Sequence, residues 1–512
     1  MTLHIPLDAA RLDRALALLP REAHQHFIGG KPVPGESGET IARESPAHGV
    51  LVSRVPAGTE GDARRAIAVA HEAFVSGRWP RTPGAERARV LHRMADLIER
   101  DREILATMDA LEAGKPIAQA RDEIAGAADI WRYAAGLARQ IAGESYSNLG
   151  EERLGLVLRE PIGVVGIVTP WNFPFLIVSQ KLPFALAAGC TAVVKPSEMT
   201  SSSTLHCARL LAEAGLPDGA ANVVTGTGPA VGRVLTQDPR IDMVSFTGST
   251  AVGKAVMAAA AETLKKVSME LGGKNPQIVF PDADLEAASD AAAFGAYFNA
   301  GECCNAGSRL ILHRDVAAGF VATLTDRARS VPVGDPLDER TRVGALVSAA
   351  HRDKVLSAIA AARDGGAAIR AGGEPMGGPG FFVAPTLIDG VAPDMAAARE
   401  EIFGPVVSVL TFETAAEAIA LANATAYGLS AGVWSRDIDT VMAVGRGVRA
   451  GTVWANTFMD GAPELPFGGY GQSGLGRELG RNAALDYTEE KTFHIRTGPR
   501  TAWWSVDPTG RG

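Results

Sequence analysis

The chain has 512 residues, of which 46% are hydrophobic and 21% are charged, which predicts a globular protein of about two to four domains. Its formal net charge of -8, without a basic cluster, argues against a nucleic-acid partner. No run approaches the length of a membrane span, and the chain begins without a secretory signal pattern. Four cysteines are too few for a disulfide framework, so we expect free thiols and a cytoplasmic location.

The first quarter of the chain is predicted to be a helical preface. Residues 1–55 are punctuated by Pro and Gly and predict an extended arm with little periodicity. Apolar residues then recur at helical spacing over 62–74 and 82–98, and more helix is expected from 103 to 143.

After Ile162 the pattern changes to short β-branched runs that alternate with Ala- and Leu-rich helices. This alternation predicts a doubly wound parallel sheet that is covered on both faces and binds its ligand beyond the carboxyl ends of the strands. The expected strands are 164–168, 191–195, 221–224, 242–246 and 266–269, with helices at 175–188, 201–214, 229–236 and 250–263.

A second series predicts a second α/β domain. It begins with a strand at 277–280, continues through a helix at 285–298 and a strand at 309–313, and runs to about residue 475. The tail after Glu489, which contains Trp503 and Trp504, is too short to fold alone and is expected to pack on a neighbouring surface or subunit.

Polar residues follow several of the predicted strands. Asn172 lies in Thr-Pro-Trp-Asn-Phe-Pro (169–174), where prolines fix the direction of its amide. It could donate to developing negative charge or simply cap the next helix. Glu198, in Lys-Pro-Ser-Glu (195–198), stands where ribose hydroxyls bind in dinucleotide folds, and its charge favours NAD over NADP.

The fourth strand leads into Gly248-Ser-Thr-Ala-Val-Gly253-Lys254, where glycine and a helix N-terminus can approach a phosphate. The spacing also matches a nucleoside-triphosphate P-loop. That alternative is disfavoured because the next residue is Ala255, whereas a P-loop needs Ser or Thr to ligate magnesium. Neither zinc-binding nor serine-hydrolase signatures occur, and no metal is expected.

Two further stretches can carry proton and nucleophile chemistry. Glu270 ends the fifth strand against glycines, where partial burial would suit a general base, although a structural ion pair is the simpler interpretation. Cys303 and Cys304 lie among small residues in 297–309, and from this stretch alone they are as well explained as packing residues as they are as nucleophiles.

Together these motifs resemble the aldehyde dehydrogenase superfamily, over about 27–491. The motifs that carry the resemblance are Thr-Pro-Trp-Asn-Phe-Pro (169–174), Lys-Pro-Ser-Glu (195–198), Phe-Thr-Gly-Ser-Thr (246–250) with Gly253, Glu-Leu-Gly-Gly-Lys (270–274), Cys304 with Arg309, Glu-Ile-Phe-Gly-Pro (401–405) and Pro-Phe-Gly-Gly (466–469). Several independent motifs in family order make a chance match negligible.

The resemblance implies an aldehyde dehydrogenase-like fold in three parts. These are an NAD-binding domain (23–143 and 162–272), a catalytic domain (273–476) and oligomerisation segments (144–161 and 477–512). It also implies a homodimer or homotetramer that acts on a small-molecule aldehyde.

The family mechanism implies roles for five residues. Cys304 attacks the carbonyl, Asn172 stabilises the oxyanion, and Glu270 activates the water that hydrolyses the thioester left after hydride transfer to NAD. Lys181 and Glu478 match a pair thought to assist proton transfer. Glu302 stands where the family usually has Gln and adds a carboxylate that could raise the thiol pKa or shape substrate entry.

The remaining site residues also come from the resemblance. The cofactor set is Thr169, Trp171, Lys195, Glu198, Gly228, Phe246, Gly248, Ser249, Gly253, Glu401 and Phe403, and the substrate set is Phe173, Gln180, Gly461 and Phe467. Asp460 and Glu464 make the entrance acidic, which suits a polar or cationic aldehyde. The Asn456-Thr457 and Pro463-Glu464 pattern is somewhat similar to betaine-aldehyde and amino-aldehyde dehydrogenases. A CoA-acylating or semialdehyde dehydrogenase and a catalytically silent relative stay as alternatives.

The Gly301-Glu302 pair aligns Cys304, not Cys303, with the nucleophile. We therefore expect Cys304→Ala to abolish NADH production with an aldehyde and NAD, because no thiolate remains to attack. Cys303→Ala is the matched control and should keep much of the activity. Steady-state absorbance at the NADH band measures both, and the reverse result would overturn the assignment.

Overall fold

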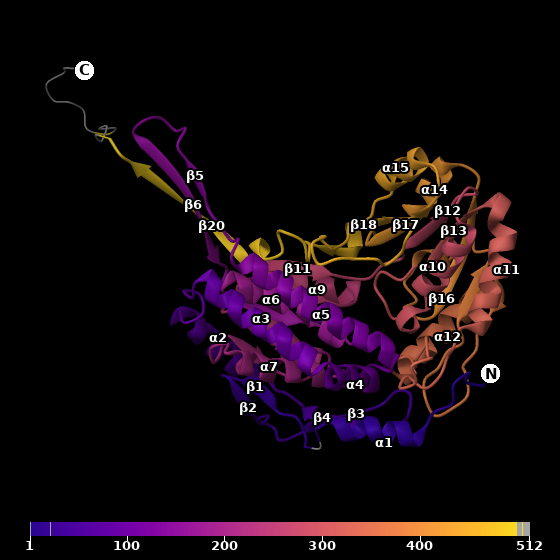
Figure 1. The fold of residues 1–512 in the computed structure, drawn as a ribbon, viewed down its shortest axis with the longest axis horizontal. Helices are drawn as coiled ribbons and strands as arrows, with labels where there is room; N and C mark the ends of the chain where they lie inside the picture. The colour runs from indigo at the N-terminus through magenta and orange to yellow at the C-terminus, as the bar shows by residue number, and fades with distance from the viewer. Residues whose placement is uncertain (1, 21, 499–503, 505–512) are drawn as a thin grey trace.

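The computed structural model of the protein describes residues 2–20, 22–498 and 504. Two sheets form its body, and a third, smaller sheet projects from it (Figure 1). The chain opens with a helix and two short hairpins: α1 (Ala9–Leu18), β1 (His26–Ile28), β2 (Lys31–Val33), β3 (Thr40–Glu44) and β4 (Leu51–Pro56).

The first sheet has eight strands in the order β19-β11-β10-β7-β8-β9-β1-β2. Its central strands run parallel and are buried on both faces, so they read as continuous apolar runs without alternation. The strands not yet bounded are β7 (Val164–Val168), β8 (Thr191–Lys195), β9 (Ala221–Val223), β10 (Met243–Thr247), β11 (Lys266–Glu270) and β19 (Gly474–Leu475).

Helices cover both faces of this sheet. One face packs in the largest hydrophobic core, which includes Leu91, Trp131 and Phe184, and on the other face strand residues such as Val244 pack with the helix residue Ile67. These helices are α2 (Glu60–Val75), α3 (Gly84–Arg100), α4 (Arg102–Ala113), α5 (Ile117–Ala138), α6 (Pro174–Ala188), α7 (Ser202–Ala214), the π-helical turn η1 (Gly228–Gly232), α8 (Arg233–Gln237) and α9 (Thr250–Ala261).

The second sheet has seven strands in the order β14-β15-β16-β13-β12-β17-β18, all parallel except the β14–β15 pair. Its strands are β12 (Pro276–Val279), β13 (Arg309–His313), β14 (Ala368–Ala371), β15 (Thr386–Asp389), β16 (Val406–Phe412), β17 (Ser430–Trp434) and β18 (Thr452–Ala455). Its helices are α10 (Leu285–Tyr297), η2 (Phe298–Gly301), α11 (Arg314–Ser330), α12 (Ala349–Asp364), α13 (Ala396–Arg399), α14 (Ala415–Ala422) and α15 (Ile438–Gly447).

A three-stranded antiparallel sheet forms the projecting arm (Figure 1). It consists of β5 (Glu144–Tyr146), β6 (Arg153–Pro161) and β20 (Thr488–Arg496), and β6 pairs with β20 along nine residues. Two short turns, η3 (Gly471–Ser473) and η4 (Leu485–Tyr487), precede β20. Trp503 lies outside the described residues, whereas the Trp504 side chain is exposed.

The predicted α/β class is confirmed, and two local predictions are wrong. Residues 1–55 include a helix, α1, because Asp8 caps it at the Arg11 N–H and Arg11 is held by Asp335 and Asp338. The helix expected over 103–143 is broken at 114–116, where Gly114 is left-handed (φ 86°) and Pro116 cannot continue the turn; helix then stops at Ala138.

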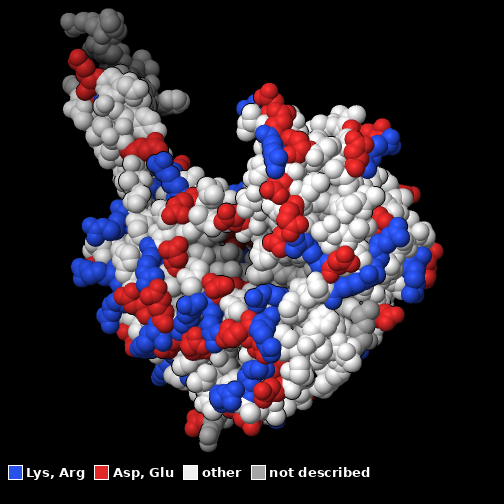
Figure 2. Space-filling view, turned by 45° about the vertical axis from the view of Figure 1, so that its right-hand side comes forward, with Lys and Arg blue, Asp and Glu red and all other residues white. Residues whose placement is uncertain are grey.

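No helix in the described ranges is both long and apolar enough to cross a bilayer. On the face shown in Figure 2, acidic and basic side chains are interspersed over the surface. The body therefore presents a mixed-charge surface there, without a single-sign region of the kind that steers large polyions.

Candidate active site

The carboxyl ends of the central strands bring the predicted polar residues of the first domain to one edge. Lys195 is the register partner of Val168, the residue before Thr169, and Thr247 is the partner of Glu270. Parallel pairing alone places these side chains at a common edge of the sheet. This is where a doubly wound sheet is expected to bind a ligand.

The cysteine loop (residues 298–308) approaches this edge from the second domain. It begins with three consecutive left-handed residues, Asn299 (φ 50°), Ala300 (φ 53°) and Gly301 (φ 71°). Two of these carry a Cβ and are strained in this region, so tertiary contacts must hold them. The Asn299 side chain supplies such contacts, because its amide donates to the Asn172 and Glu302 carbonyls, both at 3.0 Å.

Gly301 is required by a close approach as well as by its dihedral angle. A Cβ at this position would lie 1.9 Å from the Gly404 carbonyl oxygen. The cysteine loop therefore packs directly on the backbone of the Glu-Ile-Phe-Gly-Pro segment (401–405).

The two cysteines have different surroundings. Cys303 is buried, donates to the Asn305 side-chain oxygen at 2.8 Å, and packs with Phe173 and Ala306. Cys304 is partly exposed, and the Asn275 amide holds its carbonyl at 2.9 Å. A side-chain hydrogen bond with Cys303 and burial raise the pKa of the Cys304 thiol. Cys304 is thus the accessible thiol, and it needs a base to become a thiolate at neutral pH.

Asn172 lies beside this loop, as predicted, and is buried at the start of α6. Its Nδ2 donates to the Glu302 carbonyl at 3.0 Å, which fixes the amide plane and leaves one of the two N–H groups of Nδ2 for another acceptor. The α6 helix has no side-chain cap, so the interpretation of Asn172 as a helix cap is wrong.

Glu270 is 4% exposed, and neither of its carboxyl oxygens has a hydrogen-bond partner among the described residues. Oε1 faces the backbone of Gly468, where a Cβ would lie 2.6 Å away. Burial, followed by the nearby Glu478, raises the pKa of Glu270 well above its ordinary value, and Cys304 contributes in the same direction. An unpaired, desolvated carboxyl next to a thiol has the properties of a general base.

Lys181 and Glu478 form a buried ion pair close to Glu270. The Lys181 ammonium also donates to Ser245 Oγ at 3.2 Å. Burial raises the pKa of Glu478, although Lys181 opposes the shift. The pair therefore places a second exchangeable proton beside the Glu270 carboxyl.

The predicted cofactor residues of the first domain line the same edge. The Lys195 ammonium donates to the half-exposed Glu198 carboxylate at 3.1 Å. The buried hydroxyls of Thr169 and Thr247 lack a partner among the described residues. An ammonium, a carboxylate and two orphan hydroxyls fit the ribose and phosphate groups of a dinucleotide.

Glycines keep the approach to α9 open. Ser249 caps the helix, and the Gly248 N–H donates to the Glu270 carbonyl at 3.0 Å. Gly253 packs so closely on Leu271 that a Cβ would lie 2.5 Å from it, while Phe246 is buried beneath Gly248. Gly228 lies apart from α9 at the exposed start of η1, with open space at its Cβ position.

The segment 401–403 leads toward β16 of the second sheet and reaches the same edge of the first sheet. Glu401 accepts from the Gly273 N–H at 2.9 Å, and burial raises its pKa to about 7. Phe403 is held in the left-handed region (φ 59°) and packs edge-on against Trp171, with ring centroids 5.4 Å apart.

His351 completes this aromatic group and was missed by the sequence interpretation. Its ring contacts Trp171 at 5.4 Å, and its Nε2 donates to the Phe403 carbonyl at 2.7 Å. A lone histidine near the start of a helix gives no sequence signal for this contact. Asn299 was also missed, although Asn is the residue type most tolerant of a left-handed φ after glycine.

The four predicted substrate residues differ in their burial and in their surroundings. Phe173 stacks on Phe298 at 6.2 Å in a small apolar cluster that includes Cys303, and the buried Lys115 ammonium lies 4.3 Å from the Phe173 ring centre. Gln180 is half-buried on α6 and Phe467 pairs its backbone with Glu478. Gly461 is exposed, with nothing within 4 Å of its Cβ position.

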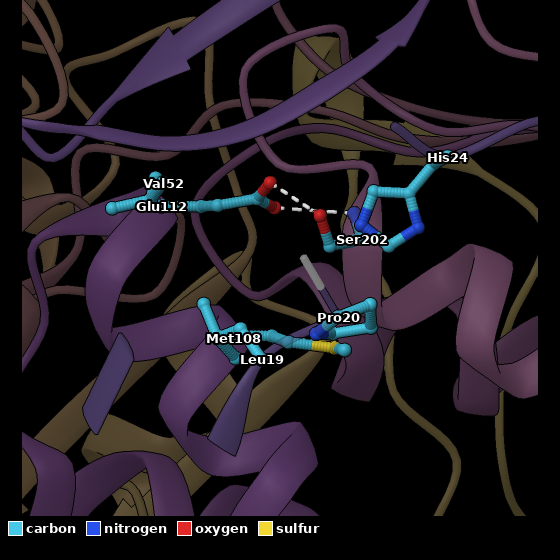
Figure 3. Close-up of a pocket in the computed structure, with 7 residues that line it drawn as sticks. All are labelled: Leu19, Pro20, His24, Val52, Met108, Glu112 and Ser202. Atoms are coloured by element: carbon cyan, nitrogen blue, oxygen red, sulfur yellow. Dashed lines mark hydrogen bonds between the residues drawn. The ribbon is translucent and has the colours of Figure 1, made fainter. Parts of the chain in front are cut away.

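A small enclosed space elsewhere, between α4 and α7, has no room for a water molecule (Figure 3). Its polar groups are satisfied, because Glu112 accepts from the Ser202 N–H and hydroxyl, and burial lowers the pKa of His24 to about 4 and keeps the ring neutral. This space is a packing gap and not a second site. Within the described ranges, no cluster of three acidic, His or Cys side chains could hold a metal ion.

Comparison with known proteins gives the class of this site. The profile of the "Aldehyde dehydrogenase family" matches residues 33–493. The chain belongs to this family.

Relatives match over almost the whole chain. An aldehyde dehydrogenase of Aspergillus niger is 43% identical over 92% of this chain and 95% of its own length. The structure of an NAD-dependent aldehyde dehydrogenase from Sinorhizobium meliloti has 51% identity and a TM-score of 0.96, covering 98% of this chain and 99% of that one. Betaine aldehyde dehydrogenase from Staphylococcus aureus, solved with NAD+, has 37% identity and a TM-score of 0.94, covering 96% and 98%.

We expect Gly301→Ala to lose most aldehyde dehydrogenase activity and about 2–4 kcal/mol of stability, because the added methyl meets the Gly404 carbonyl in a left-handed backbone. Enzyme assay and urea unfolding measure the two effects. Gly319→Ala, on α11 where a Cβ meets nothing within 4 Å, is the matched control and should be neutral or slightly stabilising. Wild-type behaviour of Gly301→Ala would contradict this packing.

Proposed function

We propose that the protein oxidises an aldehyde to the carboxylic acid with NAD+ as hydride acceptor. One observation carries the proposal: the partly exposed Cys304 thiol, the fixed Asn172 amide and the unpartnered Glu270 carboxyl converge from two domains. Nucleophile, oxyanion donor and base in one desolvated place are the three groups that acyl chemistry at a thiol needs. A catalytically silent relative would have no use for an unpaired buried carboxyl.

Cys304 forms the bond to substrate. Once deprotonated, its sulfur attacks the aldehyde carbon and gives a thiohemiacetal whose oxygen carries negative charge. The free N–H of Asn172, together with the Cys304 backbone N–H, stabilises that oxygen. The rigid link between Asn172 and Glu302 keeps the donor in place before substrate arrives.

Bound NAD+ would supply the acceptor for the hydride of the thiohemiacetal carbon. Lys195 and Glu198 would hold its adenosine ribose, and Gly248, Ser249 and Gly253 its pyrophosphate, at the N-terminus of α9. Glu401 and Phe403 would hold the nicotinamide half. The remaining proposed contacts are Thr169, Trp171, Gly228 and Phe246. The Glu198 charge favours NAD+ because it would repel the 2′-phosphate of NADP+.

Glu270 completes the reaction by removing a proton from water, which hydrolyses the Cys304 thioester to the carboxylate and restores the thiol. Its buried, unpaired state keeps it from being neutralised by a resident cation. The Lys181–Glu478 pair would pass that proton on toward solvent. An intact base also favours hydrolysis over transfer to CoA, so the acylating and semialdehyde alternatives rank second.

The substrate proposed is a polar or cationic aldehyde. Asp460 and Glu464 are exposed on the loop near Gly461, and the half-buried Gln180 would add a polar side chain to a lining that includes the apolar Phe173. The half-buried Phe467 would complete the lining. Negative charge at an entrance concentrates cations, which supports a betaine-like or amino-aldehyde substrate.

Assembly into a homodimer or homotetramer is proposed through the projecting arm. Its strands expose Tyr146, Leu158, Phe493 and Ile495, which a monomer would leave in water. We also propose that the chain is divided into three parts. Residues 23–143 and 162–272 would bind the cofactor, residues 273–476 would form the catalytic part, and residues 144–161 and 477–512 would mediate assembly. The cytoplasmic location stays a prediction.

A panel of aldehydes tested with NAD+ and NADP+ checks the proposed function. We expect NADH formation with a kcat/KM for betaine aldehyde or an aminoaldehyde above that for hexanal, and higher kcat/KM with NAD+ than with NADP+. A strong preference for hexanal would refute the proposal of a polar substrate. If neither cofactor were reduced with any aldehyde, the proposed aldehyde dehydrogenase activity itself would be refuted.

Glu270→Gln separates hydride transfer from hydrolysis. The variant should release about one NADH per active site in a burst and then turn over about 10²–10⁴-fold more slowly, because the thioester forms but water is not activated. Since the pKa of Glu270 is raised, wild-type steady-state turnover should increase with pH as the carboxyl ionises, and the variant should lose that dependence. Loss of the burst together with turnover would count against this role.

A further inference from the structure

The buried Glu302 carboxyl is not aimed at open solvent or at a surface cation. It is 2% exposed, and its Oε1 accepts from the Val347 N–H at 2.9 Å. The same oxygen lies 3.6 Å from Nε2 of His351. The side chain thus points from the cysteine loop toward the segment that leads into α12.

His351 carries this contact onward to the cofactor side. Its Nε2 hydrogen is donated to the Phe403 carbonyl at 2.7 Å, and its ring packs against Trp171 and Phe403. Phe403 is in a left-handed conformation, which a non-glycine residue keeps only when neighbours hold it. The His351 bond is one of the contacts that hold it.

We propose that Glu302 and His351 are positioning residues that together fix the Phe403 carbonyl, and that the loss of a proton from this pair loosens the cofactor side of the site. The inference rests on the proposed use of NAD+. It assigns a role to the carboxylate that replaces the commoner glutamine of the resembling family, without placing Glu302 in contact with any reacting atom.

The geometry explains why one proton matters. A protonated Glu302 is a neutral hydrogen-bonding group and mimics glutamine, so the His351 Nε2 hydrogen is free to bond Phe403. An ionised Glu302 at 3.6 Å attracts the same hydrogen and competes with the Phe403 carbonyl. Ionisation therefore weakens the hydrogen bond from His351 of α12 to the Phe403 carbonyl.

Burial favours the neutral form of both members of the pair, Glu302 and His351. Burial raises the pKa of Glu302 well above its ordinary value, although Lys115 and Arg43 oppose the shift. Burial likewise lowers the pKa of His351, as does Lys354, while the Phe403 carbonyl opposes the shift. Cys303 and Cys304 follow Glu302 on its own loop. Because the pKa of Glu302 is raised in the folded protein, the hydrogen bond from His351 to Phe403 is intact at pH values below that pKa. The bond weakens as the pH rises through the Glu302 pKa and the carboxyl ionises.

The test measures the dissociation constant of NAD+ directly, by calorimetry at pH 7 and pH 9 with full-length protein and no aldehyde. We expect the wild-type constant to be larger at pH 9 by about tenfold, the effect of losing one hydrogen bond to a buried carbonyl. Glu302→Gln, which keeps the shape and cannot ionise, should reduce this ratio to about one. Glu374→Gln changes an exposed glutamate far along the chain, is the matched control, and should keep the wild-type ratio.

A double-variant cycle shows whether Glu302 acts through His351. His351→Gln keeps a neutral N–H donor, so adding Glu302→Gln to it should change the pH ratio no further. Equal ratios in wild type and Glu302→Gln would overturn the inference while leaving the proposed function standing. Absence of NAD+ binding to wild type at both pH values would overturn both.

Discussion

The site depends on one constraint, the left-handed run at 299–301. Three such residues in succession reverse the chain so sharply that the end of α10 and the start of β13 meet. The Asn299 amide offsets the strain by donating hydrogen bonds to two carbonyls, that of Glu302 in its own loop and that of Asn172 in the loop before α6. Together with the Asn172 amide, which donates to the same Glu302 carbonyl, this bridge ties Asn172 to the loop that carries Cys304.

The site also depends on the burial of its ionisable groups away from water. Glu270, the Lys181–Glu478 pair and Glu401 are ionisable groups removed from water, and burial is the largest cause of the raised pKa at Glu270, Glu478 and Glu401. Lys274 obeys the same rule with opposite sign, since burial lowers the pKa of its amine to about 7. Burying ionisable groups costs folding energy, and their concentration at one edge marks where protons are handled.

Much of the site was predictable because the carboxyl ends of parallel strands lie at the same edge of a sheet, so residues at predicted strand ends are expected to be neighbours. Asn172 follows β7, Lys195 ends β8 and Glu270 ends β11, and strand ends of one parallel sheet must share an edge. The helices and strands from 164 to 313 were predicted within a few residues for a different reason. Their signal, apolar helical spacing or a short β-branched run, lies within a short stretch of sequence.

What escaped prediction is long-range. His351 is recognisable only through its contact with Phe403, fifty-two residues away, and Asn299 only through bonds that need both domains. The helix α1 was missed because its stability lies in ion pairs with Asp335 and Asp338, more than three hundred residues on. Propensity within a short window carries no information about such partners.

The projecting arm imposes an order of events on the newly made chain. Its middle strand β6 pairs with β20 along its whole length, and the two strands are separated by more than three hundred residues. During synthesis β6 emerges long before β20, so the β6 edge that pairs with β20 stays open while the second sheet is still being translated, and only the short pairing with β5 is available. The arm is therefore among the last parts to be completed, and a ribosome that stalls before residue 488 leaves an open, adhesive strand edge on an otherwise folded body.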